Sequence, residues 1–122
     1  HAPRVGHGAW NELASADQRA AWAYYGALFG WAKGGDMDMG PLGKYEFIDN
    51  QGMIGAIMPT LPDLPEPGWT TYFRVPDIDR AAEAVTEGGG AILQPPIEIP
   101  GGDFSLVAAD PQGARFGLVG AR

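Results

Sequence analysis

The sequence predicts an α+β domain made of two consecutive βαβββ modules, each with one helix on one face of a small sheet. Three observations predict this fold. A strand-like run that ends in an Asp before an Ala-rich helical stretch occurs twice, at 10–17 and at 70–77. The turns Asp49-Asn-Gln-Gly52 and Asp110-Pro-Gln-Gly113 each precede a short apolar run. A proline-rich segment separates the copies. Two copies are too few for a solenoid, so the modules are expected to pack on each other around a pseudo-twofold axis.

Module one is assigned to residues 9–58. It begins with a strand over 10–14, and Ser15 and Asp17 are capping candidates for a helix over 18–29. Apolar residues recur at helical spacing in this helix and predict a single core-facing stripe. The stripe consists of Ala20, Ala21, Tyr24, Tyr25 and Leu28. Four aromatic residues at this end of the module are expected in the core. They are Tyr24, Tyr25, Phe29 and Trp31.

The rest of module one reads as a hairpin and a last strand. Gly30 ends the helix, and Met37 and Met39 alternate with acidic residues in a strand-like pattern. A turn over 40–43 then leads to a strand over 45–48, and a further strand covers 53–58.

Residues 59–68 contain four prolines, so they can form neither a helix nor a central strand and are assigned to the linker. Module two covers 69–122. Its predicted elements are a strand over 70–75, a helix over 79–86 that ends at 88–90, and strands over 92–94, 104–108 and 114–119. Residues 1–8 have no periodicity and are assigned to a linker or tag remnant.

Composition excludes several classes of function. The 122 residues carry a net charge of -7, which disfavours binding to nucleic acid or to anionic membranes. The chain has no cysteine, so disulfides and thiolate metal sites are excluded. No apolar run approaches the roughly 20 residues that span a bilayer, and no signal peptide is recognisable. We therefore expect a soluble, cytoplasmic protein.

Five short motifs occur in the same order as in a known superfamily. They are Trp10-Asn-Glu-Leu13 with Asp17; Tyr24-Tyr25 with Leu28-Phe-Gly-Trp31; Trp69 with Tyr72-Phe73; Asp77-Ile-Asp79; and Asp110-Pro-Gln-Gly-Ala114. With these motifs the chain resembles the vicinal oxygen chelate superfamily of glyoxalases, extradiol dioxygenases and bleomycin- and fosfomycin-resistance proteins. The resemblance covers 8–119. It is closest to the second domain of bacterial members that carry two such domains in tandem.

The resemblance implies a mixed, cup-shaped sheet with its helices outside. In metal-dependent members, a divalent ion lies in the cup and is held by His and Glu on the first and last strand of each module. The corresponding positions here are Trp10, Ala56, Thr70 and Gly117. Their side chains offer at most a lone hydroxyl, so no metal and no other cofactor is expected. The small residues at 56 and 117 are expected to leave room where the ion would lie.

Strand alternation predicts which side chains line the cup. The expected ligand-binding residues are Trp10, Glu12, Ile54, Ala56, Met58, Thr70, Tyr72, Arg74, Arg115 and Gly117. This set is apolar and aromatic, with one carboxylate and two guanidinium groups, a composition typical of a small-molecule pocket. Two alternatives stay open. Trp10 either stacks on a ligand or packs in the core, and Glu12 and Arg74 either act on a ligand or pair with each other.

Four functions are weighed. The leading hypothesis is a protein that binds a small apolar or aromatic molecule without changing it, as the antibiotic-binding members do. The second is a metal-independent enzyme that uses Glu12 as acid or base. The third is a metal-dependent lyase, isomerase or dioxygenase, which the fold allows and the four metal positions oppose. The fourth is a non-catalytic dimerisation or interaction domain. The resemblance also implies a homodimer, or a partner domain within a longer chain.

Overall fold

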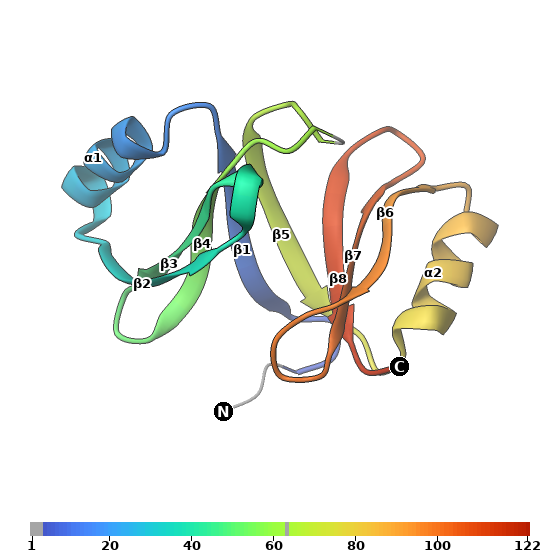
Figure 1. Ribbon diagram of the computed structural model, residues 1–122. Helices are drawn as coiled ribbons and strands as arrows, with labels where there is room; N and C mark the ends of the chain where they lie inside the picture. The colour runs from blue at the N-terminus through green and yellow to red at the C-terminus, as the bar shows by residue number, and fades with distance from the viewer. Residues whose placement is uncertain (1–3, 63) are drawn as a thin grey trace. The chain divides into compact units, whose positions relative to one another are not determined.

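A computed structural model describes residues 4–62 and 64–122 (Figure 1). The chain forms two compact units, one of residues 11–69 and the other of residues 70–122 with the N-terminal segment up to Trp10. We call them the first and second unit. Each follows the order strand, helix and three strands, so the predicted α+β class is confirmed and the order of elements is consistent with two βαβββ modules. The parts of the domain assignment that concern residues 1–3 and Asp63 lie outside the described residues.

The first unit contains α1 and the sheet order β2-β3-β4-β1. Its elements are β1 (Gly8–Ser15, whose first residues group with the second unit), α1 (Gln18–Phe29), β2 (Ala32–Asp38), the 3₁₀ helix η1 (Gly40–Leu42), β3 (Lys44–Asp49) and β4 (Met53–Pro59). β2, β3 and β4 pair antiparallel, whereas β1 pairs parallel with β4. Such a parallel pair needs a long connection, and α1 lies within it.

The second unit repeats this topology with the order β6-β7-β8-β5. Its elements are β5 (Gly68–Arg74), α2 (Ile78–Glu87), β6 (Ala91–Glu98), β7 (Phe104–Ala109) and β8 (Arg115–Gly120). Here too the first strand, β5, pairs parallel with the last, β8. β6 continues well beyond the predicted 92–94, through Pro95 and Pro96. It lies at the end of the strand order, where prolines that cannot donate to a neighbouring strand are tolerated.

The repeated aspartates perform the same local tasks in both units. Asp17 and Asp77 are the N-caps of α1 and α2, and their side chains accept hydrogen bonds from backbone N–H groups of the first turn. Asp49 accepts from the N–H of Gly52, and Asp110 accepts from the N–H groups of Gln112 and Ala114, so both fix hairpin turns. The sequence repeat therefore reflects repeated capping and turn chemistry.

Each unit has its own core between its helix and one face of its sheet. In the first unit, Leu13, Ile48 and Ile57 are buried, and three side chains of α1 pack against them: Ala21, Trp22 and Tyr25. In the second unit, Ile78 at the start of α2 is buried together with Leu106, Ala108 and Leu118 of the sheet. The opposite face of each sheet carries the other set of alternating side chains.

The predicted core stripe of α1 is wrong in part. Tyr24, Leu28 and Phe29 are 64%, 58% and 53% exposed, whereas Tyr25 and Trp31 are half-buried as expected. Apolar residues occur on both sides of this helix, and its periodicity does not say which side meets the sheet. Trp22, which the predicted stripe omitted, lies on the side that packs.

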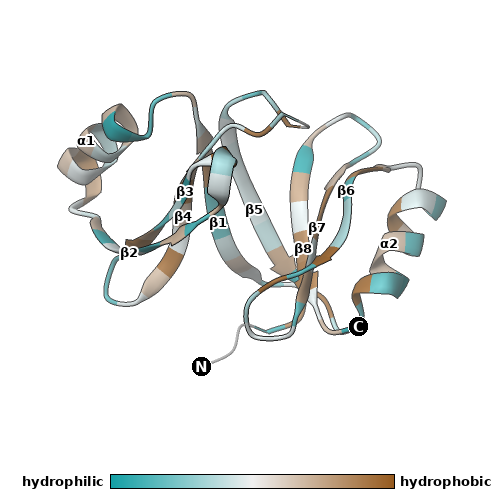
Figure 2. Ribbon diagram, in the orientation of Figure 1, coloured by the Kyte–Doolittle hydropathy of each residue, from teal (hydrophilic) through white to brown (hydrophobic). Residues whose placement is uncertain are grey.

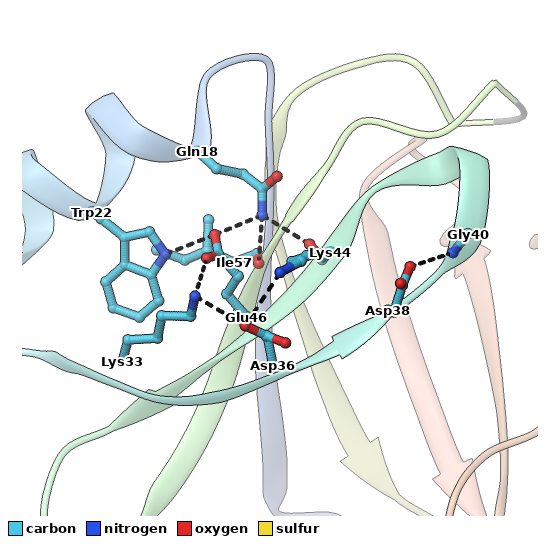
Figure 3. A network of polar contacts seen from close by, with 9 residues as sticks. All are labelled: Gln18, Trp22, Lys33, Asp36, Asp38, Gly40, Lys44, Glu46 and Ile57. Atoms are coloured by element: carbon cyan, nitrogen blue, oxygen red, sulfur yellow. Dashed lines mark hydrogen bonds and ion pairs between the residues drawn. The ribbon is translucent and has the colours of Figure 1, made fainter.

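A polar network attaches α1 to β3 and β2 (Figure 3). The Glu46 carboxylate accepts hydrogen bonds from Gln18 Nε2 at 2.9 Å and Trp22 Nε1 at 3.1 Å, and it pairs with Lys33 Nζ at 2.7 Å. Lys33 Nζ also lies 3.1 Å from Asp36. The hydrogen bond to Glu46, followed by that to Asp36, raises the pKa of Lys33, and the hydrogen bond from Lys33 lowers the pKa of Asp36. These contacts anchor a helix that has no fully buried residue.

Two backbone hydrogen bonds join the start of the described chain to β5. The N–H of Gly6 donates to the carbonyl of Arg74 at 2.8 Å, and the N–H of Arg74 donates to the carbonyl of His7 at 3.1 Å. Strand β1 begins at Gly8, earlier than the predicted start at Trp10. Among the described residues, no helix is both long and apolar enough to cross a membrane.

Candidate functional site

In the first unit, the sheet face opposite α1 carries a carboxylate among apolar and aromatic side chains. Leu13 and Ile57 point toward α1, so their neighbours along the strands point to the opposite face. On that face Glu12 lies beside Ala56 in the β1–β4 register, and Ala56 lies beside Phe47 in the β3–β4 register. Met58 follows two residues after Ala56. Three strands thus bring these residues into one row.

The Glu12 carboxylate is held by a phenol. Tyr45 Oη donates a hydrogen bond to Glu12 Oε2 at 2.7 Å, and the Tyr45 ring lies edge-on to Phe47 with centroids 5.4 Å apart. Glu12, Tyr45 and Phe47 are all half-buried, so each retains contact with solvent. This hydrogen bond fixes the direction of the carboxyl group of Glu12.

In the second unit, the corresponding face is filled by the ring of Tyr72. Tyr72 pairs with Gly117 in the parallel β5–β8 register and is only 6% exposed. A Cβ added to Gly117 would lie 2.3 Å from Tyr72 Cδ2 and 2.5 Å from Cε2. The expected free room at Gly117 is therefore absent. Gly117 on β8 instead leaves space for the ring of Tyr72, which leans across from β5.

Arg74 ends β5 and forms an ion pair with Asp103 in the segment between β6 and β7. Sequence reasoning considered a pair between Glu12 and Arg74. Within its own unit, Glu12 accepts a hydrogen bond from Tyr45 and Arg74 pairs with Asp103, and the Glu12–Arg74 pair stays a prediction. Neither partner was among the predicted site residues.

The remaining predicted residues differ in their exposure. Ala56, Met58 and Thr70 are buried, whereas Trp10 and Arg115 are half-buried. Arg115 precedes Phe116, which packs against the core beneath α2, so alternation points Arg115 to the same face as Gly117.

The predicted orientation of Ile54 is wrong. Its side chain packs against the core on the α1 side of the sheet. The register shifts here from Ile48 opposite Gly55 to Asp49 opposite Met53, so Ile54 has no residue directly across from it. A bulge of this kind breaks strict alternation and turns one side chain to the other face.

The four metal positions of the resemblance do not fit a divalent ion. Ala56 has no donor atom, the space at Gly117 is filled by Tyr72, and Trp10 offers only an N–H. Thr70 provides a single hydroxyl. Within residues 4–62 and 64–122, no group of three His, Asp or Glu side chains could hold a metal. We therefore derive no chemistry through a metal ion at these positions.

Sequence reasoning missed Tyr45, Phe47 and Asp103. The sequence did contain a signal for Tyr45 and Phe47. The turn at Asp49–Gly52 fixes the β3–β4 hairpin, and counting residues back from this turn places Phe47 opposite Ala56. Asp103 lies in an irregular segment between two strands. The sequence gives no strand register there, so the contact between Asp103 and Arg74 could not be predicted.

Comparison with known proteins gives a consistent family. The model of the Glyoxalase/Bleomycin resistance protein/Dioxygenase superfamily matches residues 4–118. The protein described as "Putative glyoxylase CFP32" of Mycobacterium tuberculosis is 35% identical in an alignment of 119 positions that covers 94% of this chain and 46% of the relative. The "Anthracycline biosynthesis protein DnrV" of Streptomyces peucetius is 31% identical over 90% of this chain and 45% of its own. The chain thus spans about half the length of these curated relatives.

Solved structures show the same fold. A methylmalonyl-CoA epimerase of Streptomyces coelicolor superposes with a TM-score of 0.66 and 17% identity, covering 97% of this chain and 99% of the epimerase. The hypothetical protein BH1468 of Bacillus halodurans C-125 also gives a TM-score of 0.66, with 12% identity over 95% of this chain and 94% of its own. At these identities the likeness concerns the fold alone.

Proposed function

This chain belongs to the Glyoxalase/Bleomycin resistance protein/Dioxygenase superfamily, and we propose that it binds a small apolar or aromatic molecule on the sheet face opposite α1, without a metal ion. The observation that carries the proposal is the hydrogen bond from Tyr45 to Glu12 beside Phe47. A few oriented polar groups in an apolar, aromatic setting are the usual makeup of a small-molecule site.

The chemistry of this face defines the ligand class. A carboxyl group can take part in several hydrogen bonds, so Glu12 can receive a hydroxyl or amine group of a ligand while Tyr45 fixes its direction. Phe47 offers an aromatic ring at 5.4 Å from that of Tyr45. A flat aromatic molecule that carries a hydrogen-bond donor fits both features.

The name of one relative suggests a probe. DnrV is described as an anthracycline biosynthesis protein, and anthracyclines are polycyclic aromatic molecules with hydroxyl and amine groups. This chain spans less than half of that relative, so an anthracycline is a test compound and its binding here is part of the proposal.

Equilibrium dialysis of the protein with an anthracycline and a panel of simpler aromatic alcohols and amines tests the proposal. Replacing Glu12 by Gln is expected to weaken binding by about tenfold to hundredfold, the range for a hydrogen bond to a charged group. Tyr45→Phe removes only the orienting hydroxyl and is expected to cost about threefold to tenfold. Glu83→Gln changes the same charge on exposed α2 and serves as the matched control.

Two outcomes of the dialysis experiment would contradict the proposal. If the parent protein binds none of the panel, or if both site variants bind as tightly as the Glu83→Gln control, the face opposite α1 is not a ligand site.

A second candidate function is metal-independent proton transfer by Glu12. The same hydrogen bond favours it, because a carboxylate held in one direction is suited to take a proton from a bound molecule and return it elsewhere. Chromatography of the panel after incubation separates the two functions. A product formed by the parent protein and not by Glu12→Gln favours catalysis, whereas unchanged compounds favour binding alone.

A further inference from the structure

Arg115 places a positive charge on the face of the second unit's sheet that lies opposite α2, which we call the far face. It begins β8 and lies opposite Ala109 of β7, in a pairing that continues without a register shift to Gly120. Alternation is therefore strict along β8. Since Phe116 packs against the core on the α2 side, Arg115 projects from the far face. The start of β8 has the hydrophilic colour, whereas the rest of the strand is pale to brown (Figure 2).

Arg115 is half-buried, yet it has no acidic partner. Among the residues that the structure describes, its guanidinium forms no ion pair. Arg74, which is also half-buried and lies on the neighbouring strand β5, pairs with Asp103. A charge that is partly withdrawn from water normally has such a partner, and a guanidinium cannot lose its proton instead. The chain has 15 acidic residues, so a shortage of carboxylates does not explain the unpaired charge.

Neither the adjacent turn nor the fold requires a charge at this position. Asp110, the nearest acidic residue along the chain, already accepts hydrogen bonds from the N–H groups of Gln112 and Ala114. In the first unit, the position equivalent to Arg115 is Ile54, whose side chain packs against the core. The order of elements thus forms with or without this charge. A half-buried guanidinium lowers the stability of the second unit unless an anion neutralises it.

We propose that Arg115 binds the carboxylate of a small apolar or aromatic acid on the far face. A guanidinium is planar, and two of its N–H groups match the two oxygens of a carboxylate. Tyr72 and Gly117 lie side by side on this face. Continuing their parallel register two residues back brings Thr70 beside Arg115, so a hydroxyl lies next to the guanidinium. The apolar body of such an acid then meets the rest of β5 and β8.

Charge favours a carboxylate over a phosphate. One guanidinium neutralises one negative charge, whereas a phosphate monoester carries about 1.5 to 2 negative charges at neutral pH. The other half-buried guanidinium of the second unit, on Arg74, is already paired with Asp103. The net charge of -7 also repels an anion more strongly as the charge of the anion rises. A monocarboxylate is therefore the anion that fits this position best.

A ¹H–¹⁵N NMR titration of the protein with 2-naphthoate tests the proposal. The uncharged probe of the same shape is 2-naphthamide, and the more highly charged one is 2-naphthyl phosphate. We expect 2-naphthoate to shift the signals of Thr70, Arg115 and Gly117. It is expected to bind about tenfold more tightly than 2-naphthamide, because a charged hydrogen-bonded pair replaces a neutral hydrogen bond.

Three variants separate binding from a structural role. Arg115→Met keeps much of the side-chain volume without the charge, and it is expected to weaken 2-naphthoate binding by about tenfold to hundredfold. Arg115→Lys keeps the charge without the planar fork and is expected to cost about threefold to tenfold. Arg80→Met removes the same charge from an exposed position of α2 and is the matched control. The Tm of Arg115→Met is expected to equal or exceed that of the parent, because an unpaired charge does not stabilise the fold.

The proposal is overturned if 2-naphthoate binds no more tightly than 2-naphthamide, or if Arg115→Met binds it as tightly as Arg80→Met does. Tighter binding of 2-naphthyl phosphate than of 2-naphthoate overturns the ligand class. A clear fall in the Tm of Arg115→Met gives Arg115 a structural role and overturns the proposal as well. These outcomes are separate from those of the proposed function, whose ligands carry a hydroxyl or amine group and whose test variant is Glu12→Gln in the first unit.

Discussion

Gly117→Ala tests whether the ring of Tyr72 fills the space that a metal-binding side chain would need. The added Cβ would lie 2.3, 2.5 and 2.6 Å from Tyr72 Cδ2, Cε2 and Cγ. Cγ is the base of the ring, so rotation of the side chain alone does not relieve the contact. The ring has to move by about 1.2–1.7 Å to reach an ordinary separation, and Tyr72 is only 6% exposed.

The cost follows from two opposing effects. Overpacking of a filled site costs about 1–3 kcal/mol. Replacing a strand glycine by alanine recovers about 0.5–1 kcal/mol of chain entropy where the backbone permits it, and Gly117 is not among the glycines with positive φ. The net loss is expected to be about 1–2 kcal/mol, or roughly 4–8 °C in Tm for a chain of this size.

Gly8→Ala is the matched control, since Gly8 also lies in a strand without positive φ and the nearest atom to its added Cβ is Thr71 Cγ2 at 3.8 Å. It is expected to be neutral or stabilising. Urea denaturation of both variants gives the free energies of unfolding, and a cycle with Tyr72→Ala isolates the coupling. If Gly117→Ala is as well tolerated as Gly8→Ala, the ring does not occupy this space and the argument against a metal ligand at 117 fails.

Three further predictions concern the metal positions, the polar network and Trp10. Elemental analysis of purified protein is expected to find no stoichiometric zinc, nickel, manganese or iron, and about one tightly held ion per chain would contradict the assignment of the four positions. Lys33 lowers the pKa of Asp36 in the folded protein. The ionised Asp36 therefore stabilises the fold at pH values above the pKa of the unfolded chain, and this stabilisation is lost as the pH falls through the lower folded pKa. Asp36→Asn is expected to make the acid side of the Tm-against-pH curve shallower, and an unchanged curve would contradict this. Trp10 is half-buried, so Trp10→Ala is expected to cost less than the roughly 3–5 kcal/mol of a sealed aromatic. A full loss of that size in urea denaturation would instead make Trp10 a core residue.

The fold could be predicted because its signals are local. Asp17 and Asp77 cap helices, and Asp49 and Asp110 fix turns, through hydrogen bonds to residues at most four positions away. Such contacts depend little on the rest of the protein, so the same residue in the same setting produces the same structure twice.

The errors arise where the result depends on contacts between distant segments. Periodicity shows that α1 has apolar residues on two sides but does not show which side meets β4. The bulge that turns Ile54 to the core depends on how β3 pairs with β4. Tyr45, which holds Glu12, lies on β3, with β4 between it and β1, and Asp103, which pairs with Arg74, lies in an irregular segment. Strand alternation placed Glu12 on its face, and only the structure shows that Tyr45 holds it there.

Mapping of ligand contacts by ¹H–¹⁵N NMR tests the central claim most directly. The protein would be titrated with the panel compound that binds most tightly in dialysis. The account predicts that the amide signals that shift most belong to β1, β3 and β4 around Glu12, Tyr45 and Phe47, and that these shifts disappear in Glu12→Gln. Shifts confined to α1, or signals that do not move at saturating compound, would contradict a ligand site on the sheet face opposite α1.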